Sequence, residues 1–374
     1  MVVTIENVAK RAGVSAGTAS RALRGHPQVS PDCVARVRAA ASELGYVPLR
    51  DRTGRSRSRP LDGRQIAILM LGLDRALSAL PSVADAIHGA EAALAEAGAH
   101  PLLVNASDPA APPKSLRREK FDGIVAKAAL QGDVIKALRS RVQATLHETP
   151  VVWMLGRPTG ATGDAVDVDD EQVGVIAARS VLDQGHRHVA IVNPKADHLL
   201  FTIRIRAFRD VVERAGGSVQ EFLPREPRES MFPLQPVMEV AQVQPLVDAA
   251  IDARCRRPGR RSASGPTALF CPADSIAALV YRAIATRGLV PGTDISVISC
   301  NHEQALSAGL WPTLATVDIH AERIGRTAVE QLARRLSGHF PEASVRIGIT
   351  PTFVPGGSLA RGPQPRRPAR PRRR

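Results

Sequence analysis

The chain of 374 residues is long enough for a large core, and 44% of its residues are hydrophobic. It carries a formal net charge of +14, and only 3% of its residues are aromatic. The longest apolar run, 66–71, is too short to cross a membrane, and the four scattered cysteines lack the C-x-x-C spacing of a structural zinc site.

The positive charge is concentrated near both ends of the chain. Residues 1–48 carry a net +3, residues 49–64 a net +4 and residues 361–374 a net +7, so the residues between are neutral overall. This distribution predicts contact with phosphates, as in a protein that binds nucleic acid. Because no signal-peptide pattern comes before the first helix, we expect a cytoplasmic, nucleoid-associated protein with reduced cysteines.

Two short helices, 5–11 and 16–24, are predicted at the N-terminus. Thr4 and Ser15 are suited to cap them, and Gly13 supplies the left-handed turn between them. Small apolar residues on the facing sides let the helices cross closely at a steep angle. This is the helix-turn-helix arrangement, in which the second helix enters the DNA major groove.

Residues 13–17 also match G-x-S-x-G, the nucleophile elbow of serine hydrolases. That elbow needs a strand before the serine and a sheet to hold it, whereas a short amphipathic helix precedes it here. A third helix, capped by Ser30 and ended by Gly45, instead completes a three-helix domain. The hydrolase interpretation is therefore disfavoured.

From residue 65 to 356, buried strands alternate with helices. The strands are expected at 66–71, 101–104, 123–125, 151–155, 188–192, 268–271 and 295–299. The helices are expected at 83–97, 134–141, 173–184, 203–215, 237–254, 276–287 and 321–336. This alternation predicts parallel sheets with helices on both faces, and the first strand lacks the G-x-G-x-x-G of dinucleotide-binding enzymes. Residues 49–64 form an Arg-rich linker or hinge, and the Arg/Pro-rich tail 357–374 is predicted to be disordered because it cannot bury a core.

The N-terminal motifs resemble the headpiece of the lactose-repressor/galactose-repressor (LacI/GalR) family of transcriptional regulators. The matching elements are T-I-x-x-V-A-x-R-A-G-V-S-x-x-T-x-S-R-x-L at 4–23, V-S at 29–30 and L-G-Y-x-P at 44–48. The core is similar to the same family at H-R-H-V-A (186–190), R-I-R-A-F (204–208), A-D (273–274) and P-T-L-A-T-V (312–317). The resemblance covers the headpiece and most of 65–355.

The resemblance implies an all-α helix-turn-helix headpiece, 1–48, followed by an α/β periplasmic-binding-protein-like core of two parallel-sheet subdomains. One subdomain is expected to hold 65–157 plus 319–345, and the other 158–318 plus 346–356. The chain would cross between them near Arg157, Ile319 and Val345. A small effector would bind in the cleft between the subdomains and change its closure.

The resemblance also places effector-binding residues at the cleft. They are Pro81, Ser82, Asp169, Arg204, Asp274 and Asn301. Their donors and acceptors suit vicinal hydroxyls, so a sugar or sugar derivative is the expected effector. Asn301 stands where the family usually has aspartate, and the alternative for Asp169 and Asp274 is that they only cap helices.

For DNA, the resemblance indicates contacts from the headpiece and the linker. The DNA-binding residues are expected to be Thr4, Ser15, Ala16, Gly17, Thr18, Ser20, Arg21, Arg24 and Arg55. Ala16 and Gly17 occupy the family's base-reading positions but offer at most a methyl contact, so readout should depend on Ser20 and Arg21. The residues suited to phosphate are Thr4, Ser15, Thr18 and Arg24, although Thr4 and Ser15 have capping as an alternative role. Arg55 replaces the family's leucine wedge, which predicts a less strongly bent operator.

Together these features predict a homodimeric, effector-controlled regulator, a repressor by resemblance, that binds a palindromic double-stranded operator. No cofactor or metal is expected. Two alternatives remain: a sugar-binding protein of the transport type, which the headpiece disfavours, and an α/β enzyme. No catalytic constellation supports the enzyme.

Overall fold

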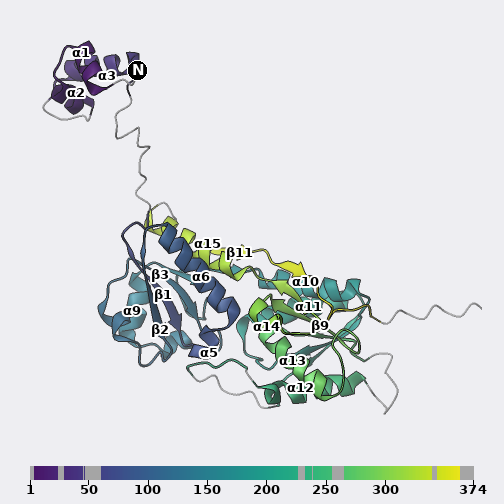
Figure 1. The fold of residues 1–374 in the computed structure, drawn as a ribbon. Coiled ribbons are helices and arrows are strands. Elements are labelled where there is room, and N and C mark those ends of the chain that lie inside the picture. The colour runs from purple at the N-terminus through teal and green to yellow at the C-terminus, as the bar shows by residue number, and fades with distance from the viewer. Residues whose placement is uncertain are drawn as a thin grey trace, which may run out of the picture. The chain divides into compact units, whose positions relative to one another are not determined.

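The computed structural model describes residues 4–23, 29–44, 46, 60–225, 232–237, 239–254, 265–338 and 343–362. The chain forms two compact units, Met1–Arg59 and Pro60–Arg374 (Figure 1). No helix among the described residues has both the length and the apolar character needed to cross a bilayer.

The first unit contains three helices, α1 (Ile5–Ala12), α2 (Ala16–Leu23) and α3 (Pro31–Glu43). Gly13 ends α1 in a left-handed conformation, with φ 68°, which a glycine adopts without strain. The small core of this unit is formed by apolar side chains from all three helices, including Val8, Ala19 and Val37. The expected helix-turn-helix headpiece is therefore confirmed.

The second unit contains two sheets, each covered by helices. The first sheet has the order β11-β5-β4-β3-β1-β2, and the second the order β12-β10-β9-β8-β6-β7. The first comprises β1 (Gln65–Leu71), β2 (His100–Ala106), β3 (Gly123–Ala128), β4 (Val151–Met154), β5 (Asp164–Val168) and β11 (Arg346–Ile349). The second comprises β6 (His188–Val192), β7 (Ser218–Phe222), β8 (Ala268–Phe270), β9 (Ser296–Asn301), β10 (Ala315–Asp318) and β12 (Thr352–Val354). Every strand pair is parallel except β10 with β12, so two parallel-dominated sheets are confirmed.

The helices of this unit lie between the strands in sequence. They are α5 (Arg75–Ser78), α6 (Pro81–Glu96), α7 (Lys114–Arg118), α8 (Val134–Ala137), α9 (Ser140–Glu148), α10 (Asp170–Asp183), α11 (Leu199–Arg214), α12 (Val240–Arg254), α13 (Asp274–Thr286), α14 (Gln304–Ser307) and α15 (Ala321–Leu336). On the first sheet α6 packs against α15, and on the second sheet α10 packs against α11 and α12 against α13 (Figure 1). A Cβ atom at Gly325 would overlap the carbonyl oxygen of Ala86, so glycine is what lets α15 approach α6 so closely.

The expected boundary between the subdomains is wrong at two strands. Both β5 and β11 belong to the first sheet, although 158–318 and 346–356 were expected in the second subdomain. The acidic sequence of β5 did not suggest a buried strand. Asp164 can be buried because it accepts hydrogen bonds from Arg335 and Gln331 of α15. We refer below to the first and second subdomains as the parts built on the first and second sheets.

Residues 357–362, which were expected to belong to a disordered tail, are instead packed on the core. Ser358 is fully buried, where its hydroxyl donates to the carbonyl of Val297 and accepts from the backbone N–H of Ala315. The N–H of Gly362 donates to the carbonyl of Gln184, which ties the chain to the end of α10. Residues 363–374 lie outside the described residues.

Candidate DNA-binding and effector sites

The candidate DNA-binding residues of the first unit lie at the starts of α1 and α2. Thr4 caps α1, and its backbone N–H donates to Oδ1 of Asn7 at 2.8 Å. The Ser15 hydroxyl accepts from the N–H of Thr18 at 3.1 Å and lies 2.8 Å from the Thr18 hydroxyl. The capping role of Thr4 and Ser15 is thus present, and it leaves the helix ends available to an anion.

The outer face of α2 exposes Ser15, Gly17 and Arg21, while Ala16, Thr18 and Ser20 are half-buried. Gly17 and Arg21 are one turn apart, and a Cβ atom at Gly17 would lie 3.7 Å from Nη2 of Arg21. The guanidinium therefore lies along the helix over the glycine. The exposed cation on this face can reach a base edge, whereas Ala16 and Gly17 cannot donate a side-chain hydrogen bond. Two other expected DNA contacts, Arg24 and Arg55, lie outside the described residues.

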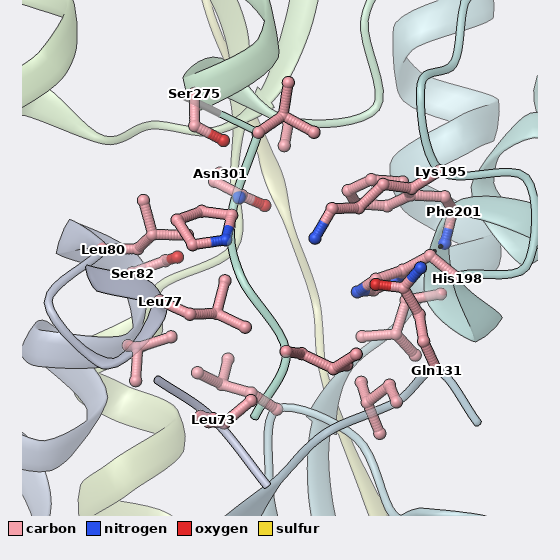
Figure 2. Close-up of a pocket in the computed structure, with 18 of the residues that line it drawn as sticks. Leu73, Leu77, Leu80, Ser82, Gln131, Lys195, His198, Phe201, Ser275 and Asn301 are labelled. Atoms are coloured by element: carbon pink, nitrogen blue, oxygen red, sulfur yellow. Dashed lines mark hydrogen bonds between the residues drawn. The ribbon is translucent and has the colours of Figure 1, made fainter. Parts of the chain in front are cut away.

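A cavity of about 120 Å³ lies between the two subdomains of the second unit. Figure 2 shows Lys195, His198, Phe201 and Gln131 on one side of it, and Leu77, Leu80 and Ser82 on the opposite side. Of the six expected effector residues, Ser82, Arg204 and Asn301 line this cavity. Half of the expected set therefore meets at one site.

Arg204 of α11 is the most fully anchored of these side chains, with 3% exposure. Its Nε donates to Oδ1 of Asp170 at 2.7 Å, and its Nη1 donates at 2.9 Å to both the Pro272 carbonyl and Oδ1 of Asn301. Burial lowers the pKa of this guanidinium, but Asp170 and the other nearby acidic groups together outweigh that effect and raise it. The guanidinium is charged and fixed in position, as the recognition of a ligand requires.

The other three expected residues do not line the cavity. Asp169 caps α10 by accepting from the N–H of Gln172, which is the alternative that the sequence left open. Asp274 is fully buried and accepts from the N–H of Glu303 at 2.8 Å and the hydroxyl of Thr316 at 2.7 Å. Pro81 lines a separate hollow. Asp169 and Asp274 thus have structural partners, and neither faces the cavity.

Glu303, which the sequence did not single out, joins the two subdomains beside the cavity. It is 1% exposed, and its Oε1 accepts from the hydroxyl of Ser82 at 2.6 Å, while its Oε2 accepts from the N–H of Ser275 at 3.1 Å. Burial raises the pKa of Glu303, and burial together with the nearby charge of Glu303 raises the pKa of Asp274 to about 7. Because Ser82 lies in the first turn of α6 and Ser275 in the first turn of α13, this carboxyl group links the two walls of the cleft.

Two lysines in the cavity wall were also missed. Lys127, in β3, is 8% exposed, and its Nζ donates to the carbonyls of Leu155 at 2.8 Å and Ala128 at 3.0 Å. Burial lowers its pKa to about 8, although Asp167 and Asp170 act in the opposite direction. Lys195 is half-buried, and its Nζ donates to the carbonyl of Gln235 at 3.0 Å. The only sequence signal was a lysine within an otherwise apolar strand, G-I-V-A-K-A, at Lys127.

His198 adds a neutral donor to the same wall. Its ring stacks on Phe201 with 4.0 Å between centroids, and its Nδ1 accepts from the N–H of Phe201. Burial, followed by the charges of Lys195, Lys127 and Arg204, holds its pKa well below the usual value. The imidazole is therefore neutral, and with Nδ1 as acceptor its proton resides on Nε2.

The segment 232–237, between β7 and α12 of the second subdomain, contacts the first subdomain and forms part of the cavity wall. The N–H of Leu234 donates to the carbonyl of Gly72 at 2.9 Å, and the N–H of Asp74 donates to the carbonyl of Leu234 at 3.0 Å. Leu234, Pro236 and Val237 then face the cavity.

Comparison with known proteins gives two family matches. Residues 4–48 match "Bacterial regulatory proteins, lacI family", and residues 178–359 match "Periplasmic binding protein-like domain". The chain is 26% identical over 348 residues to the HTH-type transcriptional regulator CelR of Thermobifida fusca, covering 91% of this chain and 93% of the relative. It is 28% identical over 340 residues to the HTH-type transcriptional repressor PurR of Aliivibrio fischeri (strain MJ11), covering 90% and 92%.

The fold agrees with these matches. A solved structure of a transcriptional regulator CelR–cellobiose complex superposes with a TM-score of 0.61 at 22% identity, covering 95% of this chain and 99% of the other. Within the described residues, no group of three His, Cys, Asp or Glu side chains is arranged to hold a metal ion. This chain therefore joins a lacI-family helix-turn-helix domain, residues 4–48, to a periplasmic-binding-protein-like domain, residues 178–359.

Proposed function

We propose that this chain is a homodimeric transcriptional repressor whose affinity for a palindromic operator is set by a small effector in the cavity between the subdomains. The observation that carries the proposal is the pairing of two sites in one chain. One is the exposed face of α2 with Arg21, and the other is the cavity where the buried cation of Arg204 is fixed between two subdomains.

In this proposal, α2 enters the major groove and Arg21 reaches a guanine edge, with Ser20 as a further base contact. The hydroxyls of Thr4, Ser15 and Thr18 hold phosphates at the helix ends. Each headpiece takes one half-site, so a two-fold dimer requires an operator with two-fold symmetry. Support for a dimer comes from Trp311, which is 84% exposed, because interface contacts are enriched in tryptophan.

Closure of the cleft is the step through which the effector acts. The Ser82–Glu303 hydrogen bond and the 232–237 segment already connect the two subdomains across the cavity. A ligand that contacts both walls would favour this closed arrangement and so shift the orientation of the subdomains. By linkage, operator DNA and effector must change each other's affinity by the same factor.

A carbohydrate is the effector class that the sequence suggested, and the related CelR regulator was solved in complex with cellobiose. The transport-type alternative does not explain the helix-turn-helix unit. An enzyme remains without a supporting observation, since the buried Lys127, Arg204 and Glu303 are held by structural hydrogen bonds.

The test is selection of genomic DNA fragments by the full-length protein at near-physiological salt, followed by sequencing. Recovery of one imperfect palindrome is expected, and Arg21→Ala should abolish its specific recovery while leaving effector binding unchanged. Arg179→Ala, on α10 of the second unit, is the matched control and should leave recovery intact. Fragments without a common sequence, or loss of effector binding with Arg21→Ala, would contradict the proposal.

A further inference from the structure

The polar groups that line the cavity are hydrogen-bond donors to an unusual degree. Lys127, Lys195 and Arg204 present three cations, and His198 presents a neutral N–H. Among the described residues that line the cavity, none carries a carboxylate. The remaining polar lining comes from Ser82, Gln131, Ser275 and Asn301, all of them uncharged.

Several of these donors are unused. Arg204 engages its Nε and Nη1 in hydrogen bonds, while its Nη2 makes none to the described part of the chain at 3% exposure. Lys127 uses two of its three protons on the carbonyls of Ala128 and Leu155, and Lys195 uses one on the carbonyl of Gln235. Because these donors belong to residues that line the cavity, a ligand that supplies acceptors can form hydrogen bonds with them.

The carboxylates near these cations lie behind them and do not line the cavity, although Asp167 and Asp170 each keep one buried oxygen without a hydrogen-bond partner among the described residues. Asp170 accepts from Nε of Arg204, and Asp167 lies near Nε of Arg346 at 3.1 Å. On the Lys195 side, Asp197 accepts from Gln131 at 2.6 Å and Asp74 caps α5. The charges that face the cavity itself are therefore positive. Burial first, and then the charges of these three cations, lower the pKa of His198.

The other residues that line the cavity are apolar. Leucines from the first subdomain, together with Phe201, Leu234 and Ile276, form most of the wall. The volume of about 120 Å³ is close to that of the ~150 Å³ apolar cavity that accommodates a benzene ring. A hydroxyl-rich molecule would place those of its polar groups that face the leucines against hydrocarbon without partners, which is unfavourable.

We propose that the effector is a small organic acid, with one anionic group held by Lys195, Arg204 and His198 and a compact apolar body in the leucine-lined part of the cavity. This inference rests on the proposed effector site. It assigns the ligand to a chemical class that differs from the neutral carbohydrate expected from the sequence. Both a carboxylate and a phosphate could satisfy the donors, and the apolar wall favours a carboxylate on a hydrocarbon body.

The experiment is isothermal titration of the full-length protein, without DNA, with benzoate, phenylacetate and hexanoate and with the amide of each acid. Glucose 6-phosphate, glucose and cellobiose complete the set. We expect at least one acid to bind at least tenfold more tightly than its amide, since charge-assisted hydrogen bonds are worth roughly ten- to a hundredfold in affinity. Glucose 6-phosphate should bind more weakly than the best acid, because its hydroxyls lack partners.

Lys195→Gln tests the assignment of the anionic group. Lys195 is half-buried and can be replaced with little change in packing, and we expect the affinity for the best acid to fall tenfold or more while its amide is unaffected. Lys136→Gln, at an exposed lysine on α8, is the matched control and should change neither affinity. The proposal is overturned if acid and amide bind equally, if none of the acids binds, or if a neutral sugar or the phosphate binds best.

Operator binding measured separately keeps the two proposals apart. If an acid binds and Lys195→Gln weakens it, yet the operator affinity does not change, the ligand class stands and the regulatory coupling fails. If a palindromic operator binds but only a sugar releases it, the regulator stands and the ligand class proposed here fails.

Discussion

Replacing Lys127 with methionine should stabilise the protein at neutral pH. The ammonium group lies within β3 at 8% exposure, and burial lowers its pKa from the usual 10.5 to about 8. A difference of about 2.5 pH units corresponds to about 3 kcal/mol at pH 7, at 1.36 kcal/mol per unit. Methionine has a similar length without charge, but it loses the hydrogen bonds to the carbonyls of Leu155 and Ala128, each worth about 1 kcal/mol. The expected net gain in the free energy of unfolding is about 1–2 kcal/mol.

The sign of the pH dependence follows from proton binding. Between pH 8 and pH 10.5 the unfolded chain holds the Lys127 proton more tightly than the folded chain, so raising the pH through this window stabilises the wild type. The penalty of about 3 kcal/mol at pH 7 falls to about 1.4 kcal/mol at pH 9.5 by the same relation. Methionine does not titrate. The advantage of Lys127→Met over the wild type should therefore shrink by about 2 kcal/mol between these two pH values.

Urea unfolding at pH 7 and pH 9.5, followed by circular dichroism, measures both quantities. Lys136→Met is the control, since Lys136 is exposed on α8 and its replacement should change stability by less than ~0.5 kcal/mol at either pH. The reasoning is refuted if Lys127→Met is less stable than the wild type at pH 7, or if the difference between them does not change with pH. A stabilised variant that also binds organic acids more weakly would mark Lys127 as a residue retained for ligand binding at the expense of stability.

Two further predictions concern packing and assembly. Gly325→Ala should lower the free energy of unfolding by about 1–3 kcal/mol in urea titrations, because the new methyl group overlaps the backbone of α6. Gly309→Ala is the control and should be neutral, because its methyl group would meet no atom within 4 Å. Equal effects of the two substitutions would contradict the argument that glycine permits the close approach of α15 to α6. Trp311→Ser should raise the dimer dissociation constant at least tenfold in sedimentation equilibrium. Val290→Ser, at another exposed apolar residue, is the control and should leave the constant unchanged. An unchanged dissociation constant with Trp311→Ser would show that Trp311 does not lie in the dimer interface.

The headpiece could be predicted from sequence because its determinants are local. Thr4, Gly13 and Ser30 each act within a few residues, as a cap or a left-handed turn, and their order along the chain fixes three helices. The central strands of both sheets were also predictable, since strands buried on both faces are continuous apolar runs. Arg204 and Asn301 were located differently, because both lie at positions where the core resembles the family.

The strands that were missed depend on distant residues. Asp164 and Asp167 give β5 an acidic sequence typical of a loop, and burial becomes possible only because Arg335 and Arg346, far along the chain, pair with these carboxylates. The sequence could not indicate that pairing, so the crossover between the subdomains was placed before β5. Asp169 shows that the resemblance alone can mislead. The resemblance placed this acid at the cleft, but in the structure it caps α10 and does not line the cavity.

The chemistry of the cavity was hidden for a related reason. Lys127 lies within a strand, Lys195 lies in the loop before α11, and Arg204 lies on α11 itself, so only the folded subdomains bring the three cations to one cavity. Asn301 then acquires a clearer meaning. It accepts a hydrogen bond from Arg204 without adding the negative charge that an aspartate would carry, and so it orients the guanidinium while leaving the cavity positive. A substitution that keeps the geometry and removes the charge is what an anionic effector requires, and a neutral sugar would gain nothing from it.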